Sequence, residues 1–312
     1  MKLPPAPRAG RGDGPPPSAD RRQTTVTAVI VTATGSVALV DACLDSLRDA
    51  RPVDVDLSAA VVDNASTDDL VDAVAHRHPW ASVHALSTNL GFAAATNVGI
   101  ERTESEFVLV LNPDTEVPRG AIEALVSVLR RTPGAAAAGP RLVDRAGVAD
   151  HNAKRRFPTL RGALRHFVPT ATRGRSGYAA VEVGEFDEAP VDAVSGSCMM
   201  VRRAAIEQVG LLDEAYWMYG EDLDWCRRFG RHGWKVIYCG QATVLHVKHG
   251  VTGQHRTLRT NWAFHRAMGR FYRKFDAGHR PLVDGLVYSA VLMKFAASAG
   301  SSVLRRTLAR SA

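Results

Sequence analysis

The first half of the chain alternates short apolar runs with longer stretches in which apolar positions recur at helical spacing. The apolar runs are VTAVIVT (26–32), LSAAVVD (57–63), SVHALS (82–87) and EFVLVL (106–111). Such runs, rich in Val, are typical of strands buried on both faces. The helical stretches lie at 37–50, from Thr67 or Asp68 to about His78, from Gly91 onward, and from Pro118 to about Arg131. Short connections between them predict right-handed crossovers and an α/β fold with a doubly wound, mostly parallel sheet.

The second half has a less regular pattern, which opens with a loop-rich insert at 141–180. The elements predicted after it are a strand at 191–201, a short helix near 203–209, a helix opened by GEDLDWCRRFGRHG and ending at Gly233, strands KVIYCG and ATVLHV, and two tail helices broken near 278–281. We therefore expect three parts: a disordered Pro- and Gly-rich arm (1–24), one folded domain (25–253) and a basic helical tail (254–312).

The formal charge of +7 is unevenly distributed along the chain. Residues 1–23 carry +3 and residues 254–312 carry +9, so the folded middle carries −5. A nucleic-acid-binding domain concentrates basic charge on its folded part, so we expect no nucleic acid as a partner. Basic ends around an acidic domain favour contact with an anionic membrane surface instead. Four scattered cysteines and an N-terminus without an apolar signal segment indicate a reducing, cytoplasmic compartment.

One segment of the tail, 285–304, contains twenty residues with a single charge, Lys294. Its length would suffice for a membrane span. Its many Ser, Ala and Gly residues and the central Lys294 instead favour a helix that lies at the membrane surface. A helix packed on the folded domain is the alternative. We expect a peripheral protein at the inner face of the plasma membrane.

Polar residues follow the predicted strands where the carboxyl ends of a parallel sheet should gather around a ligand. Asp63 ends one strand, and its carboxylate could accept from the ring N–H of a nucleobase, while a capping turn is the alternative. Asn112 and Asp114 follow another strand. Asp114 is the better ligand for a hard divalent cation, although Asn-Pro-Asp is also a common turn sequence.

Three further residues are candidates for chemistry in the second half. Glu221 and Asp222 begin a helix after the aromatic loop AYWMYG, and a carboxylate there could act as a general base or simply favour the helix start. His246 could complete a metal site or form a hydrogen bond in the core. The insert also holds a basic cluster that could bind a diphosphate or remain solvated, namely Lys154, Arg155, Arg156, Arg161 and Arg165.

The order of these signals resembles that of the family-2 inverting glycosyltransferases, in particular the bacterial rhamnosyltransferase-like members that extend lipid-linked cell-envelope glycans. The resemblance runs from about Val26 to Thr252. It rests on VTAVIVTATG, VVDNASTD, NLGFAAATNVGI, LVLNPDTEV, VSGSCMMVRR and, most specifically, GLLDEAYWMYGEDLDWCRRFGRHGWKVIYCGQATVLHVKHGVT. It implies a GT-A-type nucleotide-sugar-binding fold.

The resemblance also implies roles for individual residues. Donor binding falls to Asp63, Asn64, Asn89, Gly91, Asn97 and Asn112. Asp114 and His246 would hold Mg²⁺ or Mn²⁺, and Asp222 would be the general base with Glu221 beside it. The chain departs from the family pattern at Ala33-Thr34, where a Tyr-Asn pair is usual, and at Asn112, where many relatives have a carboxylate.

The implied function is an inverting transfer of a sugar, with rhamnose from dTDP-rhamnose favoured, to a hydroxyl of a lipid-linked or other glycan acceptor. A sugar nucleotidyltransferase is one alternative, but VTATGSVALVD lacks the basic residue expected in a triphosphate-binding loop. A non-catalytic, membrane-attached nucleotide-sugar-binding module is the other. Such a module would have no need of both Asp114 and Asp222.

Overall fold

The structure is a computed structural model that describes residues 23–33, 37–158, 178–247, 257–278 and 280–310. The expected arm at 1–24 therefore lies almost wholly outside the described residues. Eleven strands are present in this described part: β1 (Thr24–Thr32), β2 (Val55–Asp63), β3 (Ala81–Ala85), β4 (Phe107–Leu111), β5 (Thr115–Glu116), β6 (Ala135–Val143), β7 (Lys154–Arg155), β8 (Glu188–Val191), β9 (Ala193–Val194), β10 (Cys198–Arg202) and β11 (Lys235–His246).

The central sheet has the order β3-β2-β1-β4-β10-β6-β11-β5, and β8 pairs with β11. The first four strands are parallel, as their continuous apolar runs predict. The register places Thr32 beside Asp63 and Ile30 beside Leu111, so β1, β2 and β4 end at the same edge. This half confirms the predicted doubly wound arrangement and gathers its strand-end polar residues at that edge.

The other half of the sheet differs from the prediction in three places. Ala135–Val143 forms the central strand β6, which the sequence pattern did not indicate, because a run of alanines has low strand propensity. The strand expected at 191–201 is interrupted by a turn at 195–197, and β10 then runs antiparallel to β4. The two strands expected as KVIYCG and ATVLHV form one strand, β11, with an irregular register between Cys239 and Thr243.

Helices cover the sheet at the predicted places. They are α1 (Val37–Asp49), α2 (Leu70–Arg77), α3 (Phe92–Glu101), α4 (Ala121–Arg131), α6 (Arg203–Val209), α7 (Glu221–Arg231), α8 (Leu258–Phe275) and α9 (Pro281–Arg310), with a short 3-10 turn, η1, at His151–Ala153. The predicted cap at Thr67 or Asp68 was wrong, because α2 begins at Leu70 and its N-cap residue, Asp69, makes no capping hydrogen bond. Helix α3 packs on β1 and β2, while α4 packs on β6 and β11.

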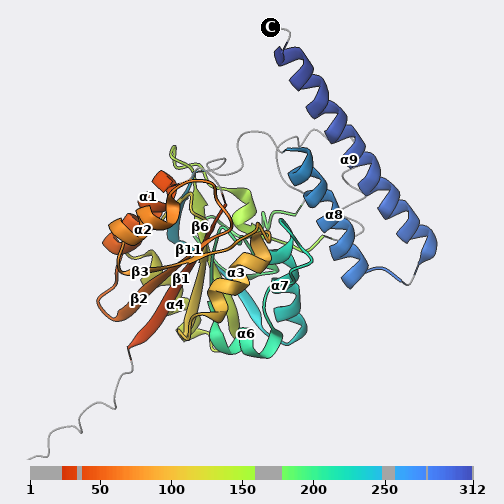
Figure 1. The fold of residues 1–312 in the computed structure, drawn as a ribbon. Helices are drawn as coiled ribbons and strands as arrows, with labels where there is room; N and C mark the ends of the chain where they lie inside the picture. The colour runs from red at the N-terminus through yellow and green to blue at the C-terminus, as the bar shows by residue number, and fades with distance from the viewer. Residues whose placement is uncertain (1–22, 34–36, 159–177, 248–256, 279, 311–312) are drawn as a thin grey trace, which may run out of the picture.

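The tail forms the two helices that the break near 278–281 predicted. Figure 1 shows α8 between the folded domain and α9, which is the outermost element. Among the described helices, one segment, Pro281–Gly300 of α9, is long and apolar enough to cross a membrane, with a mean hydropathy of 1.4, and none of it is buried. Leu282 and Leu286 are 86% and 71% exposed. The apolar surface of α9 therefore lacks a cover from the described part of the chain.

Candidate functional site

Asp63 lies at the end of β2 and is buried. Its Oδ1 accepts a hydrogen bond from the backbone N–H of Ser66 at 2.9 Å and another from the Ser66 hydroxyl. The turn passes through Ala65, whose φ of 61° is uncommon for a residue with a side chain. The structure thus holds the Asp63 carboxylate in a fixed turn at the strand-end edge.

Asn64 and the loop at 89–91 are joined by hydrogen bonds. The buried Asn64 amide donates to the carbonyl of Gly91 at 3.1 Å and accepts from the N–H of Leu90 at 2.8 Å, and Asn89 Oδ1 accepts from Gly91 N at 3.0 Å. Gly91 has a φ of 91°, and a Cβ there would lie 2.4 Å from the carbonyl oxygen of Trp217. Only glycine fits this position.

Asn97 lies on α3 and connects it to the loop before α7. Its amide donates to Leu212 O at 2.9 Å and to Glu214 Oε1 at 3.0 Å, and accepts from Leu212 N at 3.0 Å. Asn97, like Asn64, thus has its amide bonded to the protein itself. In this structure both side chains position the loops around the site rather than offer free polar groups to a ligand.

Asp114 and His246 are brought together by the pairing of β5 with β11. Val247 N donates to Asp114 O at 2.8 Å, and His246 Nε2 lies 3.4 Å from Asp114 Oδ1, which is longer than a good hydrogen bond. Asp114 Oδ1 and His246 Nδ1 are buried without a hydrogen-bond partner among the described residues. Buried polar atoms are usually satisfied, so this pair fits a divalent cation that neither side chain yet contacts.

The described residues contain no cluster of three or more His, Cys, Asp or Glu side chains suited to a metal. His249, a weaker candidate from sequence, lies outside the described residues. Asn112 is close along the chain but donates through its amide to Ser197 Oγ at 3.2 Å. Within the described structure the protein supplies two metal ligands, and a bound substrate would have to supply others.

Asp222 lies in the first turn of α7 and is buried. Its Oδ2 accepts from Arg155 Nη2 at 2.6 Å and from Gly196 N at 3.0 Å. Burial alone would lower the pKa of Arg155, but the charge of Asp222 and the hydrogen bond to it raise that pKa. Sequence reasoning missed this ion pair, since no local pattern links two residues that are 67 positions apart.

Glu221 has a different environment from its neighbour. Burial, and then the negative charge of Asp222, raise the pKa of Glu221 to about 8, from 4.5. Glu221 Oε2 is buried without a partner among the described residues. The preceding residues adopt positive φ, 69° at Tyr219 and 83° at Gly220, which turns the chain sharply into α7. At neutral pH the pair therefore holds one ionised carboxylate, Asp222, beside one that is largely protonated.

The two acidic pairs are connected through the turn that interrupts the strand after β9. Asn112 N donates to Ser197 O at 2.9 Å at the end of β4, and the adjacent Gly196 donates to Asp222. A Cβ on Gly196 would lie 3.3 Å from Asp222 Cβ, so the turn packs directly against the carboxylate. The same carboxyl edge of the sheet therefore carries both Asp114 and Asp222.

The basic cluster of the insert does not form the diphosphate site that the sequence suggested. Lys154 Nζ donates to Gly184 O at 2.7 Å, and Arg156 forms ion pairs with Glu182 and Asp192. Together with the pairing of Arg155 and Asp222, these contacts use all three described side chains within the fold. Arg161 and Arg165 lie outside the described residues.

The basic residues of α8 are also divided differently from the prediction, which assigned all of them to a membrane surface. Arg270 and Lys274 contact Asp213 at 3.0 and 2.8 Å, and Lys274 also contacts the buried Asp224 at 2.6 Å. Burial opposes ionisation, yet hydrogen bonds from Lys274 and Arg270 lower the pKa of Asp213 to about 2. These two residues attach α8 to the folded domain.

Comparison with known proteins places the chain among sugar-transferring enzymes. The family model described as "Glycosyltransferase like family 2" matches residues 24–273. The N-acetylglucosaminyl-diphospho-decaprenol L-rhamnosyltransferase of Mycobacterium tuberculosis is 36% identical over 223 residues, which cover 67% of this chain and 71% of that relative.

Two solved structures share the fold at low sequence identity. The mannosyltransferase PcManGT from Pyrobaculum calidifontis, in complex with GDP-Man and Mn²⁺, has a TM-score of 0.58 and 18% identity, covering 91% of this chain and 76% of that one. GalNAc-T7 with UDP, GalNAc and Mn²⁺ has a TM-score of 0.60 and 14% identity, covering 81% of this chain and 48% of that one. These similarities confirm the predicted GT-A-like fold class.

Proposed function

Because this chain belongs to glycosyltransferase family 2, we propose that it moves a sugar from a nucleotide-sugar donor to an acceptor hydroxyl with inversion at the anomeric carbon. The observation that carries the proposal is the placement of Asp222 and Asp114 at one edge of the sheet, connected through Asn112, Ser197 and Gly196. One carboxylate is ionised and aligned by the protein, and the other is paired with an imidazole and lacks a hydrogen bond.

We propose rhamnose from dTDP-rhamnose as the transferred sugar and a lipid-linked N-acetylglucosamine as the acceptor. The support is the 36% identity to a relative whose name specifies an L-rhamnosyl transfer to N-acetylglucosaminyl-diphospho-decaprenol. On the donor side, Asp63 would receive the nucleobase, with the Asn89–Gly91 loop beside it. Asn64 and Asn97 would hold that loop in place.

In the proposed reaction Asp222 is the general base. The acceptor hydroxyl gives its proton to the Asp222 carboxylate while its oxygen forms a bond to the anomeric carbon. The bond from that carbon to the diphosphate oxygen breaks, and the electron pair leaves with the nucleoside diphosphate. Glu221 is less suited to this role, because burial keeps it largely protonated at neutral pH and a protonated carboxyl cannot accept the proton.

Asp114 and His246 would hold a divalent cation, Mg²⁺ or Mn²⁺, next to the donor diphosphate. Such a cation supplies charge neutralisation for the departing diphosphate. Two protein ligands are few for these cations, which take about six oxygen or nitrogen ligands, so diphosphate oxygens and water would complete the shell. We expect metal binding and donor binding to depend on each other.

We further propose that the enzyme works at the cytoplasmic face of the membrane, with α9 as its attachment. The support is the exposed apolar surface of Pro281–Gly300. High salt or carbonate should then release the protein from isolated membranes, and deletion of residues 279–312 should make it soluble with nucleotide binding intact. Release by detergent alone would show that α9 spans the bilayer instead.

The decisive experiment is incubation of the purified protein with N-acetylglucosaminyl-diphospho-polyprenol and a panel of nucleotide sugars. We expect transfer from one donor and a product of inverted anomeric configuration by NMR. Nucleoside triphosphate consumption with a sugar 1-phosphate would favour a nucleotidyltransferase. Donor binding without turnover of any donor would favour a binding module.

A further inference from the structure

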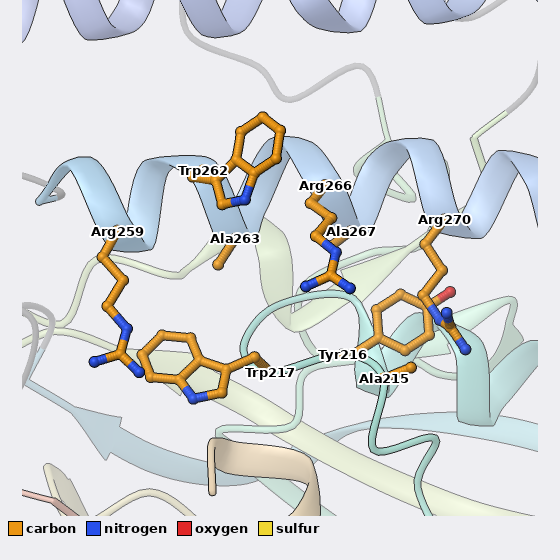
Figure 2. Close-up of a pocket in the computed structure, with 9 residues that line it drawn as sticks. All are labelled: Ala215, Tyr216, Trp217, Arg259, Trp262, Ala263, Arg266, Ala267 and Arg270. Atoms are coloured by element: carbon orange, nitrogen blue, oxygen red, sulfur yellow. The ribbon is translucent and has the colours of Figure 1, made fainter. Parts of the chain in front are cut away.

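A cavity of about 270 Å³ lies between α8 and the loop that precedes α7. Figure 2 shows its lining: three arginines and Trp262 from α8 on one side, and Tyr216 and Trp217 from the loop on the other. The arginines are Arg259, Arg266 and Arg270. Their spacing of seven and four residues places them along one face of the helix.

The cavity carries unbalanced positive charge. The charge of Arg270 is matched by Asp213, at 3.0 Å. Arg259 lies over the ring of Trp217, 4.2 Å from its centroid, and Arg266 is exposed. Neither Arg259 nor Arg266 forms an ion pair with a described carboxylate, and the lining contains no acidic residue. Two guanidinium groups that face the same space, with aromatic rings beside them, suit a dianionic ligand such as a diphosphate.

The loop wall of the cavity is the same loop that contacts both halves of the proposed active site. Trp217 O accepts from Phe92 N at 2.7 Å, and Trp217 lies against Gly91 of the donor loop. Gly220 packs between Tyr216 and Ala267, and the next two residues are Glu221 and Asp222. A ligand in the cavity would therefore lie beside the start of the helix that carries the proposed base.

The opposite side of the cavity leads to the apolar tail. Trp262 is 48% exposed and packs edge-on against Phe295 of α9, with ring centroids 5.1 Å apart. Leu292 and Met293, in the same stretch of α9, are 58% and 62% exposed. A positively charged cavity joined to an exposed apolar helix matches an amphiphile with an anionic head and a long hydrocarbon chain.

We propose that this cavity binds the diphosphate of a polyprenyl-diphosphate-linked acceptor, with Arg259 and Arg266 as its ligands and Trp262 guiding the chain toward α9. The proposal rests on the proposed function for the identity of the acceptor. It places the acceptor sugar, which is attached to that diphosphate, on the Asp222 side. The diphosphate site that the sequence suggested in the 151–166 insert is thereby assigned to α8.

The test is a titration of the full chain in detergent with N-acetylglucosaminyl-diphospho-farnesol, for wild type, Arg259→Ala, Arg266→Ala and the double variant. Loss of one charge-assisted contact should weaken binding about tenfold to a hundredfold. Binding of the nucleotide sugar should stay within about twofold, since the donor contacts lie elsewhere. The matched control is Arg273→Ala, an exposed arginine on the same helix that does not line the cavity.

Each outcome decides between explanations. Equal losses in Arg273→Ala and Arg266→Ala would show general electrostatic attraction and overturn the site. An equal loss of Arg266→Ala binding to an alkyl N-acetylglucosaminide, which lacks the diphosphate, would also overturn it, as would no wild-type binding of the diphosphate probe. Weaker binding of Arg266→Ala to phosphatidylglycerol vesicles without acceptor would assign the arginine to a lipid headgroup. Probe binding lost only in the cavity variants, with no turnover by wild type, would support the cavity and refute the proposed function alone.

Discussion

The two acidic centres of the proposed active site differ in how their carboxylates are satisfied. Asp222 accepts from a guanidinium and a backbone N–H, both within 3.0 Å. Asp114 faces an imidazole at 3.4 Å and keeps a buried oxygen without a hydrogen bond among the described residues. Both carboxylates are buried to a similar degree.

This difference separates a group that the protein prepares from one that a ligand must complete. A buried carboxylate is costly unless it is paired, and Arg155 offsets that cost for Asp222 before any substrate binds. The fold offers no equivalent cation to Asp114 in the described structure. The Asp222 side is therefore preorganised for proton transfer, while the Asp114 side depends on a cation that arrives with the donor.

The largest effect is expected from Asp222→Asn, which keeps the shape of the side chain and removes its capacity to accept a proton. We expect kcat to fall on the order of 10²-fold or more, with nucleotide binding nearly unchanged, because a base acts mainly in the transition state. Steady-state kinetics and calorimetry measure the two quantities. The matched control is Asp72→Asn on the exposed face of α2, and wild-type kcat in Asp222→Asn would disprove the assignment of the base.

Asp114→Ala should act on the other centre. We expect the divalent-cation concentration required for half-maximal activity to rise by about tenfold or more, and donor affinity to fall with it, since the cation would bridge protein and diphosphate. The checks are cation titrations of activity and donor titrations with and without EDTA. His246→Ala should raise the cation requirement if His246 is a ligand and lower only Tm if it is a core residue. Turnover in EDTA at the wild-type rate would refute the metal site.

Arg155→Ala should convert the prepared centre into one that resembles the other. Removal of one partner of a buried ion pair should lower the free energy of unfolding by about 3 kcal/mol. The acid limb of the kcat profile should also move to higher pH, because the carboxylate loses the charge that favours its ionised form. Arg155→Lys, which keeps the charge, should move it less. An unmoved acid limb in Arg155→Ala would mean that the arginine has a structural role only.

The smallest effect concerns Glu221 and stability against pH. The pKa of Glu221 is raised from 4.5 to about 8, so between these values the folded state holds a proton that the unfolded state has lost. The free energy of unfolding should therefore fall as pH rises through this window. Urea denaturation at about pH 5 and about pH 8 should show wild type losing about 1–3 kcal/mol relative to Glu221→Gln.

The control for this measurement is Glu123→Gln, a change at an exposed glutamate of α4. It should leave the dependence of stability on pH as in wild type. Parallel curves for wild type and Glu221→Gln would show that the buried carboxyl does not take up a proton on folding.

The sequence by itself determined the parallel half of the molecule and the order of its chemical groups. Continuous apolar runs can be satisfied only by strands covered on both faces, and parallel strands place their carboxyl ends at one edge. The positions of Asp63, Asp114 and Asp222 at strand ends and a helix start follow from this local pattern. The helical hairpin of the tail was likewise readable from its periodicity and from the break near 278–281.

Only the tertiary structure decided which partners these groups meet. Strand β6 is a strand because its alanines fill a tight place between β10 and β11, and not because alanine favours strands. Arg155 pairs with Asp222 across a long loop, and Arg270 serves Asp213 while Arg266 faces a cavity. Charge counted along the chain treats all these arginines alike. Their roles differ because Coulomb interactions and burial depend on distances in space, which folding sets and sequence spacing does not.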